Sequence, residues 1–184
     1  MICKPYYFNT KDGKEVTIRI IQENEIDEYH AFKYKAASET PYLGRSVDDY
    51  KTRKRNDTAT YVAEANKDKN AYLFAVIADG KIIGDCYISF TNRIKEKHDS
   101  KIGLSILKKY WNMGIGTAIL KYLEKIAKKR DGVEQISLYV VEENIRAIHL
   151  YKKCGFSIVA VLPRTIKTED GRYPNRLLMQ KLFK

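Results

Sequence analysis

Cysteine is scarce in this chain of 184 residues, which contains only Cys3, Cys86 and Cys154. Their number is odd, their spacing is wide, and they form no Cys-x-x-Cys pair with histidine partners. This pattern argues against a disulfide framework and against a bound metal ion. We therefore expect reduced thiols and a cytoplasmic location.

Long apolar segments are missing as well. The apolar run Tyr72–Ala78 is far shorter than the roughly 20 residues that a membrane-spanning helix needs. The N-terminus also lacks the pattern of a signal peptide. These absences predict a protein without a membrane partner.

The residues that are present describe a globular protein. Hydrophobic residues make up 44% of the sequence, charged residues 31% and aromatic residues 11%. Such a composition is too apolar for a disordered chain. We predict a single domain over residues 1–184, because the length suits one core and no internal repeat or linker divides it.

The formal net charge of +11 has two interpretations. It can attract a polyanion, such as nucleic acid or a phosphorylated cofactor, or it can reflect solvated surface lysines. The lysines are scattered in local clusters, and the sequence has neither an arginine-rich tail nor a basic strand studded with aromatics. We therefore expect no nucleic-acid partner.

Hydrophobic periodicity predicts alternating strands and helices. Strands are expected at residues 15–21, 72–78, 81–90, 101–107, 135–141, 156–162 and 177–182, with a short edge strand at 6–9. Helices are expected from Asn24 to about Ser38, from Ser46 with Asp49 as its capping partner, from Gly114, and from Asn144 to about Cys154. This order indicates a mixed sheet covered by helices.

One segment combines the end of a strand, two close glycines and the start of a helix. Gly114 and Gly116 follow the strand, and Ile115 and Ile119 begin an apolar helical face. Glycines let the backbone approach a ligand, and a helix N-terminus offers unpaired N–H groups with partial positive charge. The segment is therefore typical of a pyrophosphate cradle. It is not a dinucleotide fingerprint, because Ile119 stands where the third glycine belongs.

Two motifs together resemble the GNAT-type N-acetyltransferase superfamily. One runs from Leu104-Ser-Ile106 through Tyr110-Trp-Asn-Met-Gly-Ile-Gly-Thr117, and the other is Asn144-x6-Tyr151-x3-Gly155-Phe156. They lie in a core at residues 101–157, and the order of elements fits the family over roughly residues 15–183. The dipeptide Tyr110-Trp111 resembles the start of this loop in the branch that includes ribosomal-protein and aminoglycoside acetyltransferases. The usual loop has Gln or Arg in place of Trp111.

The resemblance implies an α/β (α+β) fold with a mixed, mostly antiparallel sheet of six to seven strands and about four flanking helices. It implies that acetyl-CoA is the co-substrate, that no metal takes part, and that a primary amine attacks directly. The acceptor would be a small molecule or a peptide or protein N-terminus. It would bind mainly between residues 34–50 and 164–176. Homodimers are common in the family.

The resemblance assigns ten residues to acetyl-CoA. A splay between two strands would admit the thioester, the strand backbone would pair with the pantetheine arm, and the loop amides would hold the pyrophosphate. Asn144 would hydrogen-bond the arm, cap its own helix, or do both. Lys108 or Lys109 would lie near the 3′-phosphate. The ten residues are Leu104, Ser105, Ile106, Asn112, Met113, Gly114, Ile115, Gly116, Thr117 and Asn144.

Tyr151 is the residue that the resemblance marks as the general acid. A phenol of ordinary pKa about 10 can protonate a departing thiolate, and the alternative is a core aromatic on the inner face of its helix. The base stays unassigned between Asp85, Glu39 and a water relay. Cys86 and Cys154 raise the question of a covalent route, but core packing is the simpler interpretation.

A function of another class also stays open. A coenzyme-A-binding sensor would keep the same fold without turnover. Trp111, at the position of the usual Gln or Arg, and the missing base motivate this alternative.

Overall fold

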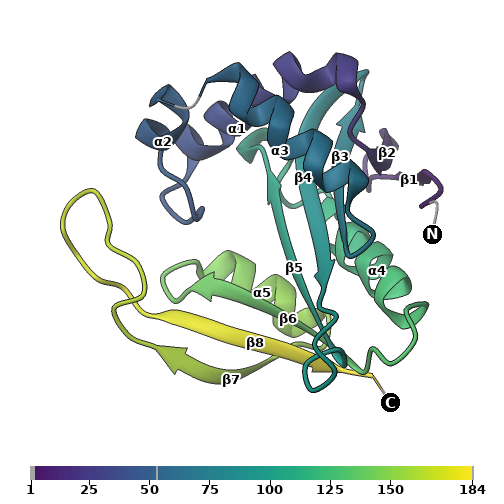
Figure 1. Ribbon diagram of the computed structural model, residues 1–184. Coiled ribbons are helices and arrows are strands. Elements are labelled where there is room, and N and C mark those ends of the chain that lie inside the picture. The colour runs from purple at the N-terminus through teal and green to yellow at the C-terminus, as the bar shows by residue number, and fades with distance from the viewer. Residues whose placement is uncertain (1–2, 53, 184) are drawn as a thin grey trace.

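The structure, a computed structural model, describes residues 3–52 and 54–183. One eight-stranded sheet runs through it in the order β1-β2-β3-β4-β5-β6-β8-β7 (Figure 1). The strands are β1 (Tyr6–Asn9), β2 (Glu15–Ile20), β3 (Ala71–Ala78), β4 (Lys81–Phe90), β5 (Asp99–Ile106), β6 (Gln135–Val141), β7 (Ser157–Leu162) and β8 (Arg176–Leu182). The helices are α1 (Ile26–Glu39), α2 (Val47–Thr52), α3 (Arg55–Lys67), α4 (Ile115–Lys128) and α5 (Ile145–Lys153), with 3-10 turns at Glu23–Glu25 and Lys108–Tyr110.

Helices cover both faces of the sheet, and β3 shows how the sequence permits this. Phe74 and Val76 belong to the core shared with α4 and α5, whereas Leu73 and Ala75 belong to the core shared with α1 and α3. All four side chains are almost fully buried. Because successive side chains of a strand point to opposite faces, an uninterrupted apolar run suits a strand that is covered on both sides.

Helix α4 joins β5 to its parallel neighbour β6 and packs along a continuous apolar stripe. Ile115, Ile119 and Leu123 recur at helical spacing and are buried, while Lys121 and Lys125 point to solvent. Burial of this stripe holds the helix against the centre of the sheet. Neither α4 nor any other helix in the described part of the chain is long and apolar enough to cross a membrane.

The ladder between β5 and β6 is short. Its residue pairs are Asp99 with Gln135, Ser100 with Ile136, and Lys101 with Ser137. Beyond them β5 stays paired with β4 up to Ile106, whereas β6 stays paired with β8 up to Val141. The two halves of the sheet therefore diverge towards the C-terminal ends of β5 and β6, as Figure 1 shows. This divergence is the splay that the resemblance implies.

The mixed, mostly antiparallel sheet confirms the predicted fold class, although three details differ. The described chain has eight strands rather than the six or seven that the resemblance implies, because the short edge strand expected at residues 6–9 is present as β1 and pairs with β2 along its whole length. The second predicted helix is divided into α2 and α3, where the Asp57 carboxylate accepts the Lys54 backbone N–H at 2.9 Å and caps a new helix. The first helix begins at Ile26 rather than after Asn24, because Glu25 caps a preceding 3-10 turn through the Gln22 backbone N–H at 2.8 Å.

The apolar stripe of α4 gives a stability prediction. Ile119 is 0% exposed, so Ile119→Ala should lower the free energy of unfolding by about 2–5 kcal/mol through lost burial and a residual cavity. Urea denaturation followed by circular dichroism measures the change. The control is Lys121→Ala, which alters the solvent face and should stay within about 0.5 kcal/mol of the parent. Equal losses in the two variants would contradict the packing described for α4.

Candidate active site

The glycine loop leads into a helix whose first amides have no helical partner. Gly114 is the N-cap of α4 and takes a φ of 88°, in the left-handed region that favours glycine. The first hydrogen bond of the helix runs from the Ala118 N–H to the Gly114 carbonyl at 3.1 Å. The N–H groups of Ile115, Gly116 and Thr117 precede this bond and are left for another acceptor. Together with the helix dipole they form a site for an anion.

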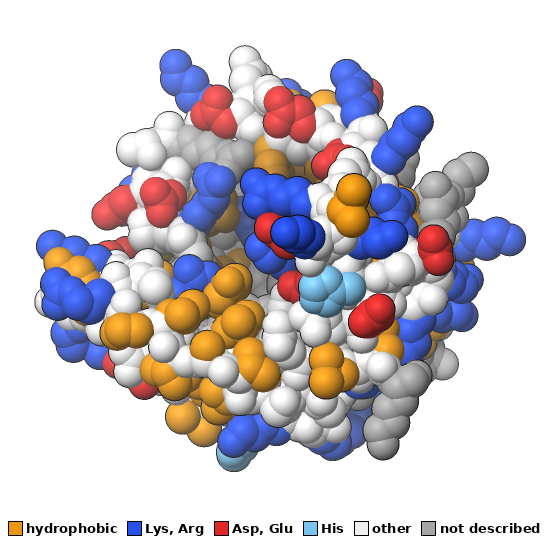
Figure 2. Space-filling view, turned by 60° about the horizontal axis from the view of Figure 1, so that its bottom comes forward, with side chains coloured by type: hydrophobic (Ala, Val, Ile, Leu, Met, Phe, Trp, Pro, Cys, Tyr) orange, Lys and Arg blue, Asp and Glu red, His pale blue; other side chains and the backbone are white. Residues whose placement is uncertain are grey.

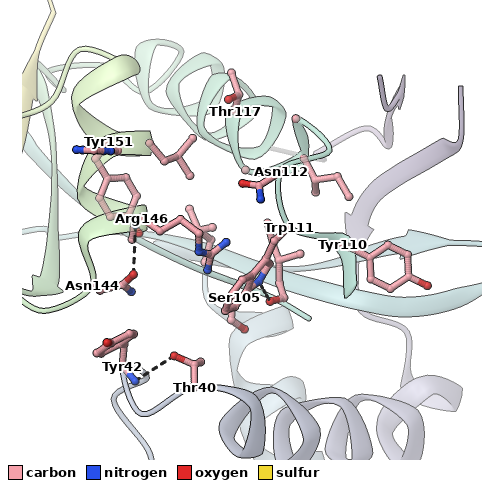
Figure 3. Close-up of a pocket in the computed structure, with 18 of the residues that line it drawn as sticks. Thr40, Tyr42, Ser105, Tyr110, Trp111, Asn112, Thr117, Asn144, Arg146 and Tyr151 are labelled. Carbon is pink, nitrogen blue, oxygen red and sulfur yellow. Dashed lines mark hydrogen bonds between the residues drawn. The ribbon is translucent and has the colours of Figure 1, made fainter. Parts of the chain in front are cut away.

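A cavity of about 480 Å³ opens beside this loop (Figure 3). Nine of the ten residues expected to bind acetyl-CoA line it, as does Tyr151. The tenth, Met113, packs against the core, and its carbonyl accepts the Lys11 backbone N–H at 3.5 Å. The other lining residues are Lys11, Ala36, Thr40, Tyr42, Leu43, Tyr110, Trp111, Arg146, Ala147, His149, Leu150 and Lys153. The fold thus brings both sequence motifs to one space, and their contact with a ligand stays a prediction.

Helices α4 and α5 approach each other closely at this cavity. A Cβ atom on Gly116 would lie 2.7 Å from Cδ2 of Leu150, which is closer than carbon atoms can pack. A side chain at residue 116 would therefore push the two helices apart or displace Leu150. The second glycine of the motif is explained by this contact.

Helix α5 presents Asn144 and Tyr151 to the cavity. Asn144 Oδ1 accepts the Ala147 backbone N–H at 3.2 Å, which confirms the predicted N-cap. Its Nδ2 group makes no hydrogen bond to another residue of the described chain and is available to a ligand. The Tyr151 ring packs against Phe156 with the ring centroids 6.0 Å apart. Burial, with a smaller contribution from Tyr87, raises the pKa of Tyr151 to about 12, so the phenol keeps its proton at neutral pH.

Trp111 has a defined structural position. Its indole Nε1–H donates a hydrogen bond of 2.7 Å to the carbonyl of Ile106, the last residue of β5. The guanidinium carbon of Arg146 lies 3.1 Å from the centroid of the Trp111 ring. In Figure 3 Arg146 reaches from α5 over Trp111 towards the glycine loop. These contacts link the end of β5 with the first turn of α5.

The cavity is electropositive. Among the described residues that line it, Lys11, Arg146 and Lys153 are cationic and none is Asp or Glu. The space-filling view shows Lys and Arg side chains bordering a hollow in one face of the molecule (Figure 2). Lys108 and Lys109, expected near a phosphate, are exposed and are absent from the lining. Their expected place near a phosphate stays a prediction, and no local sequence pattern had marked the three cations of the lining.

Asp85, one of the two residues considered as a base, lies in a buried network. Its Oδ2 accepts hydrogen bonds from the Tyr29 hydroxyl at 2.9 Å and from Lys33 Nζ at 2.8 Å, and its Oδ1 accepts one from Ser105. Burial alone would lower the pKa of Lys33, but the Asp85 carboxylate and neighbouring tyrosines outweigh it, so this pKa is raised. The network joins α1 to β4 and β5.

Glu39, the second candidate base, is also engaged. Its Oε2 accepts the backbone N–H of Lys108 at 2.5 Å. This bond joins the end of α1 to the turn that follows β5. Both oxygens of Asp85 and one oxygen of Glu39 thus accept structural hydrogen bonds, and the base stays unassigned.

The region expected to bind the acceptor reaches the cavity from one side only. Thr40, Tyr42 and Leu43, from the segment after α1, line it, and the Thr40 hydroxyl accepts the Tyr42 N–H at 3.3 Å. In Figure 3 Thr40 and Tyr42 face Asn144 across the space. Within the described chain, none of residues 164–176 is part of the lining.

The cysteines fit core packing better than a covalent route. Cys86 is 1% exposed, and burial raises its thiol pKa well above the ordinary value. Cys154 is partly buried, which likewise raises its pKa. A raised pKa disfavours the nucleophilic thiolate. The described residues include no group of three or more His, Cys, Asp or Glu side chains that could hold a metal ion.

Comparison with known proteins agrees with this geometry. The profile of the acetyltransferase (GNAT) family matches residues 33–156. The chain belongs to the GNAT family. The resemblance drawn from the two motifs is thereby confirmed, and with it the enzyme class of N-acetyltransferases.

Individual members of the family show how far the similarity extends. An N-alpha-acetyltransferase of Sulfurisphaera tokodaii is 29% identical over 169 residues, which cover 85% of this chain and 89% of that protein. A GNAT-family acetyltransferase from Streptococcus pneumoniae superimposes with a TM-score of 0.82 at 26% identity, over 91% of this chain and 99% of the other. RimL, a ribosomal L7/L12 alpha-N-protein acetyltransferase solved in complex with coenzyme A, shares the fold with a TM-score of 0.78 at 12% identity, over 91% and 94% of the two chains.

The buried network predicts an asymmetric response to substitution. The side chains of Lys33 and Asp85 are only 20% and 8% exposed. Lys33→Met should therefore lower the free energy of unfolding by about 3–5 kcal/mol, because it leaves the Asp85 charge uncompensated. Removing both charges with Lys33→Met and Asp85→Asn should cost less than the single change. Because the pKa of Lys33 is raised, its contribution is complete below the ordinary lysine pKa of about 10.4 and fades only at higher pH.

Chemical denaturation between pH 6 and pH 9 tests this prediction, and the stability lost in Lys33→Met should stay constant over this range. Lys35→Met is the matched control, because Lys35 lies on the exposed face of the same helix and its replacement should stay within about 0.5 kcal/mol. If Lys33→Met and Lys35→Met are equally stable, the ion pair has no structural role.

Proposed function

We propose that residues 1–184 form one acetyl-CoA-dependent N-acetyltransferase domain that acetylates primary α-amines. The observation that carries the proposal is the row of unpartnered amides at the start of α4, which opens into the cavity beside the splayed strands. A diphosphate fits a helix N-terminus, and an extended chain with amide groups fits an unpaired strand edge. Coenzyme A carries both groups in one molecule.

The lining residues fit this ligand in distinct roles. The amides of residues 112–117 are proposed to hold the pyrophosphate, and the backbone of residues 104–106 the pantetheine arm. Asn144 has a free Nδ2 donor for an amide carbonyl of the arm. The cations Lys11 and Lys153 provide charge for the phosphates. When bound, acetyl-CoA supplies an activated thioester.

Tyr151 is proposed as the proton donor to the leaving sulfur. The acceptor nitrogen forms a bond to the acetyl carbon and the bond from carbon to sulfur breaks. The nitrogen loses a proton to water, the sulfur gains one through Tyr151, and water restores the proton of Tyr151. With its pKa near 12, Tyr151 holds a proton at the cavity. Full transfer to a free thiolate of pKa about 8.5 is uphill by about 5 kcal/mol. Tyr151 therefore acts first through a hydrogen bond to the developing negative charge.

The charges of the cavity favour an α-amine as acceptor. The attacking amine must be neutral, which at pH 7.4 costs about 0.5 kcal/mol for an α-amine and about 4 kcal/mol for a lysine-like amine. No carboxylate lies among the described lining residues to accept the proton of such an amine, and Asp85 and Glu39 make other contacts. The cations at the cavity would also repel a polycation. A peptide N-terminus therefore fits better than spermidine or an aminoglycoside.

A coenzyme-A-binding sensor is the second candidate function. In the sequence, Trp111 at the position of the usual Gln or Arg favoured this sensor. In the structure, however, Trp111 donates to the Ile106 carbonyl and stacks with Arg146, so it is an integral part of the site. The sensor predicts binding without turnover, which separates it from the enzyme. The homodimer expected from the resemblance stays a prediction.

The first experiment measures thiol release from acetyl-CoA with a peptide that has a free N-terminus. Release should depend on the peptide, and Tyr151→Phe should lower kcat by about 100-fold or more through loss of the proton donor. Tyr7→Phe, at an exposed site on β1, is the control and should leave kcat unchanged. Binding of acetyl-CoA without release by the folded parent protein would favour the sensor.

The acceptor class is tested by comparing the same peptide with spermidine. At pH 7.4 we expect kcat/KM to be about 100-fold higher for the peptide, because deprotonation of its α-amine costs less. The rate with the peptide should level off above about pH 8, where an α-amine is mostly neutral, whereas a rate with spermidine should still rise. An N-acetylated peptide is the negative control. Preference for spermidine would contradict the assigned acceptor class while leaving the acetyl transfer itself intact.

A further inference from the structure

We propose that Arg146 binds the pyrophosphate of coenzyme A and that Trp111 is the platform that positions it. The inference rests on the proposed function, because it takes coenzyme A as the ligand. It assigns a specific phosphate contact to a side chain that comes from outside the glycine loop.

The first step is the orientation of the guanidinium group. Its carbon lies 3.1 Å from the centroid of the Trp111 ring, which is a contact through the face of both groups. Stacking leaves the N–H donors at the edge of the guanidinium plane unused. Within the described chain, Arg146 has neither a carboxylate partner nor a hydrogen bond. A planar cation with its donors free is therefore held at the cavity.

The second step is the anchoring of Trp111. Its Nε1–H donates to the Ile106 carbonyl at 2.7 Å, which fixes the indole to the last residue of β5. Asn112, the next residue along the chain, begins the glycine loop. The platform is thereby tied to the loop, although Arg146 itself comes from α5. Figure 3 shows Arg146, Trp111 and Asn112 around the same space.

The third step is the choice of phosphate. Arg146 is held over the residue directly before the loop whose amides, from Ile115 to Thr117, form the anion site. A guanidinium edge and a row of amides can grip different oxygens of one diphosphate. Lys11 and Lys153 also line the cavity and are left for the remaining phosphate. Arg146 is therefore assigned to the pyrophosphate rather than to the 3′-phosphate.

The test compares the binding of coenzyme A, 3′-dephospho-coenzyme A and pantetheine to the parent protein and to Arg146→Gln by calorimetry or competition. The variant should bind the first two ligands about 10- to 100-fold more weakly, as expected for a lost charge-assisted hydrogen bond. Its affinity for pantetheine, which has no phosphate, should be unchanged. Lys125→Gln removes the same charge from the solvent face of α4 and should leave all three affinities unchanged.

Three outcomes would overturn the proposal. An unchanged affinity for coenzyme A would remove Arg146 from the site. A loss that disappears with 3′-dephospho-coenzyme A would assign it to the other phosphate, and a loss that persists with pantetheine would show a packing effect. If the parent protein binds no coenzyme A, the proposed function fails instead, so the two failures are distinct.

Trp111 is tested as a positioning residue by a double-mutant cycle. Trp111→Leu should weaken binding of coenzyme A, and adding it to Arg146→Gln should cause little further loss, because the platform acts through Arg146. Arg146→Lys provides a second variant that keeps the charge but loses the planar fork, and it should recover only part of the affinity. Circular dichroism confirms that each variant is folded. Additive losses would show that Trp111 does not act through Arg146.

Discussion

The early end of the β5–β6 ladder is the constraint on which the site depends. After three residue pairs, β5 follows β4 and β6 follows β8, so the two strands share no further ladder. The facing edges then carry backbone N–H and C=O groups that need other partners. Trp111 satisfies one of them, the carbonyl of Ile106, through its indole N–H. The rest of this edge is suited to an extended ligand with amides of its own, as in β-strand addition.

The splay also determines where the helix N-termini lie. Helix α4 follows β5 and helix α5 follows β6, so both helices begin near the diverging ends of these strands. Their dipoles add positive potential to a lining that contains three cationic side chains and, among the described residues, no carboxylate. Because both effects are positive, the cavity favours a polyanionic ligand and disfavours an acceptor with several positive charges. The net charge of the whole chain is a weaker guide, because most of it lies elsewhere on the surface.

Local patterns in the sequence predicted the elements, and long-range contacts account for what they missed. The apolar run of β3, the helical period of α4 and the glycines before it can each be read within a few residues, because they reflect burial and backbone conformation of one element. Lys11 reaches the cavity from the β1–β2 hairpin, about a hundred residues from the loop that it contacts. Arg146 meets Trp111 only because two motifs fold together. The periodicity of a single segment cannot predict such long-range contacts.

The two carboxylates first considered as bases show how the halves of the site are aligned. Asp85 joins α1 to β4 and β5 through Lys33 and Ser105, and Glu39 joins the end of α1 to the turn after β5. The segment with Thr40 and Tyr42 continues directly from α1, so these contacts set its position over the cavity. A buried ion pair adds little net stability, because desolvation offsets its attraction, but its geometry is specific. The carboxylates therefore align the segment after α1 with the strand that lines the cavity.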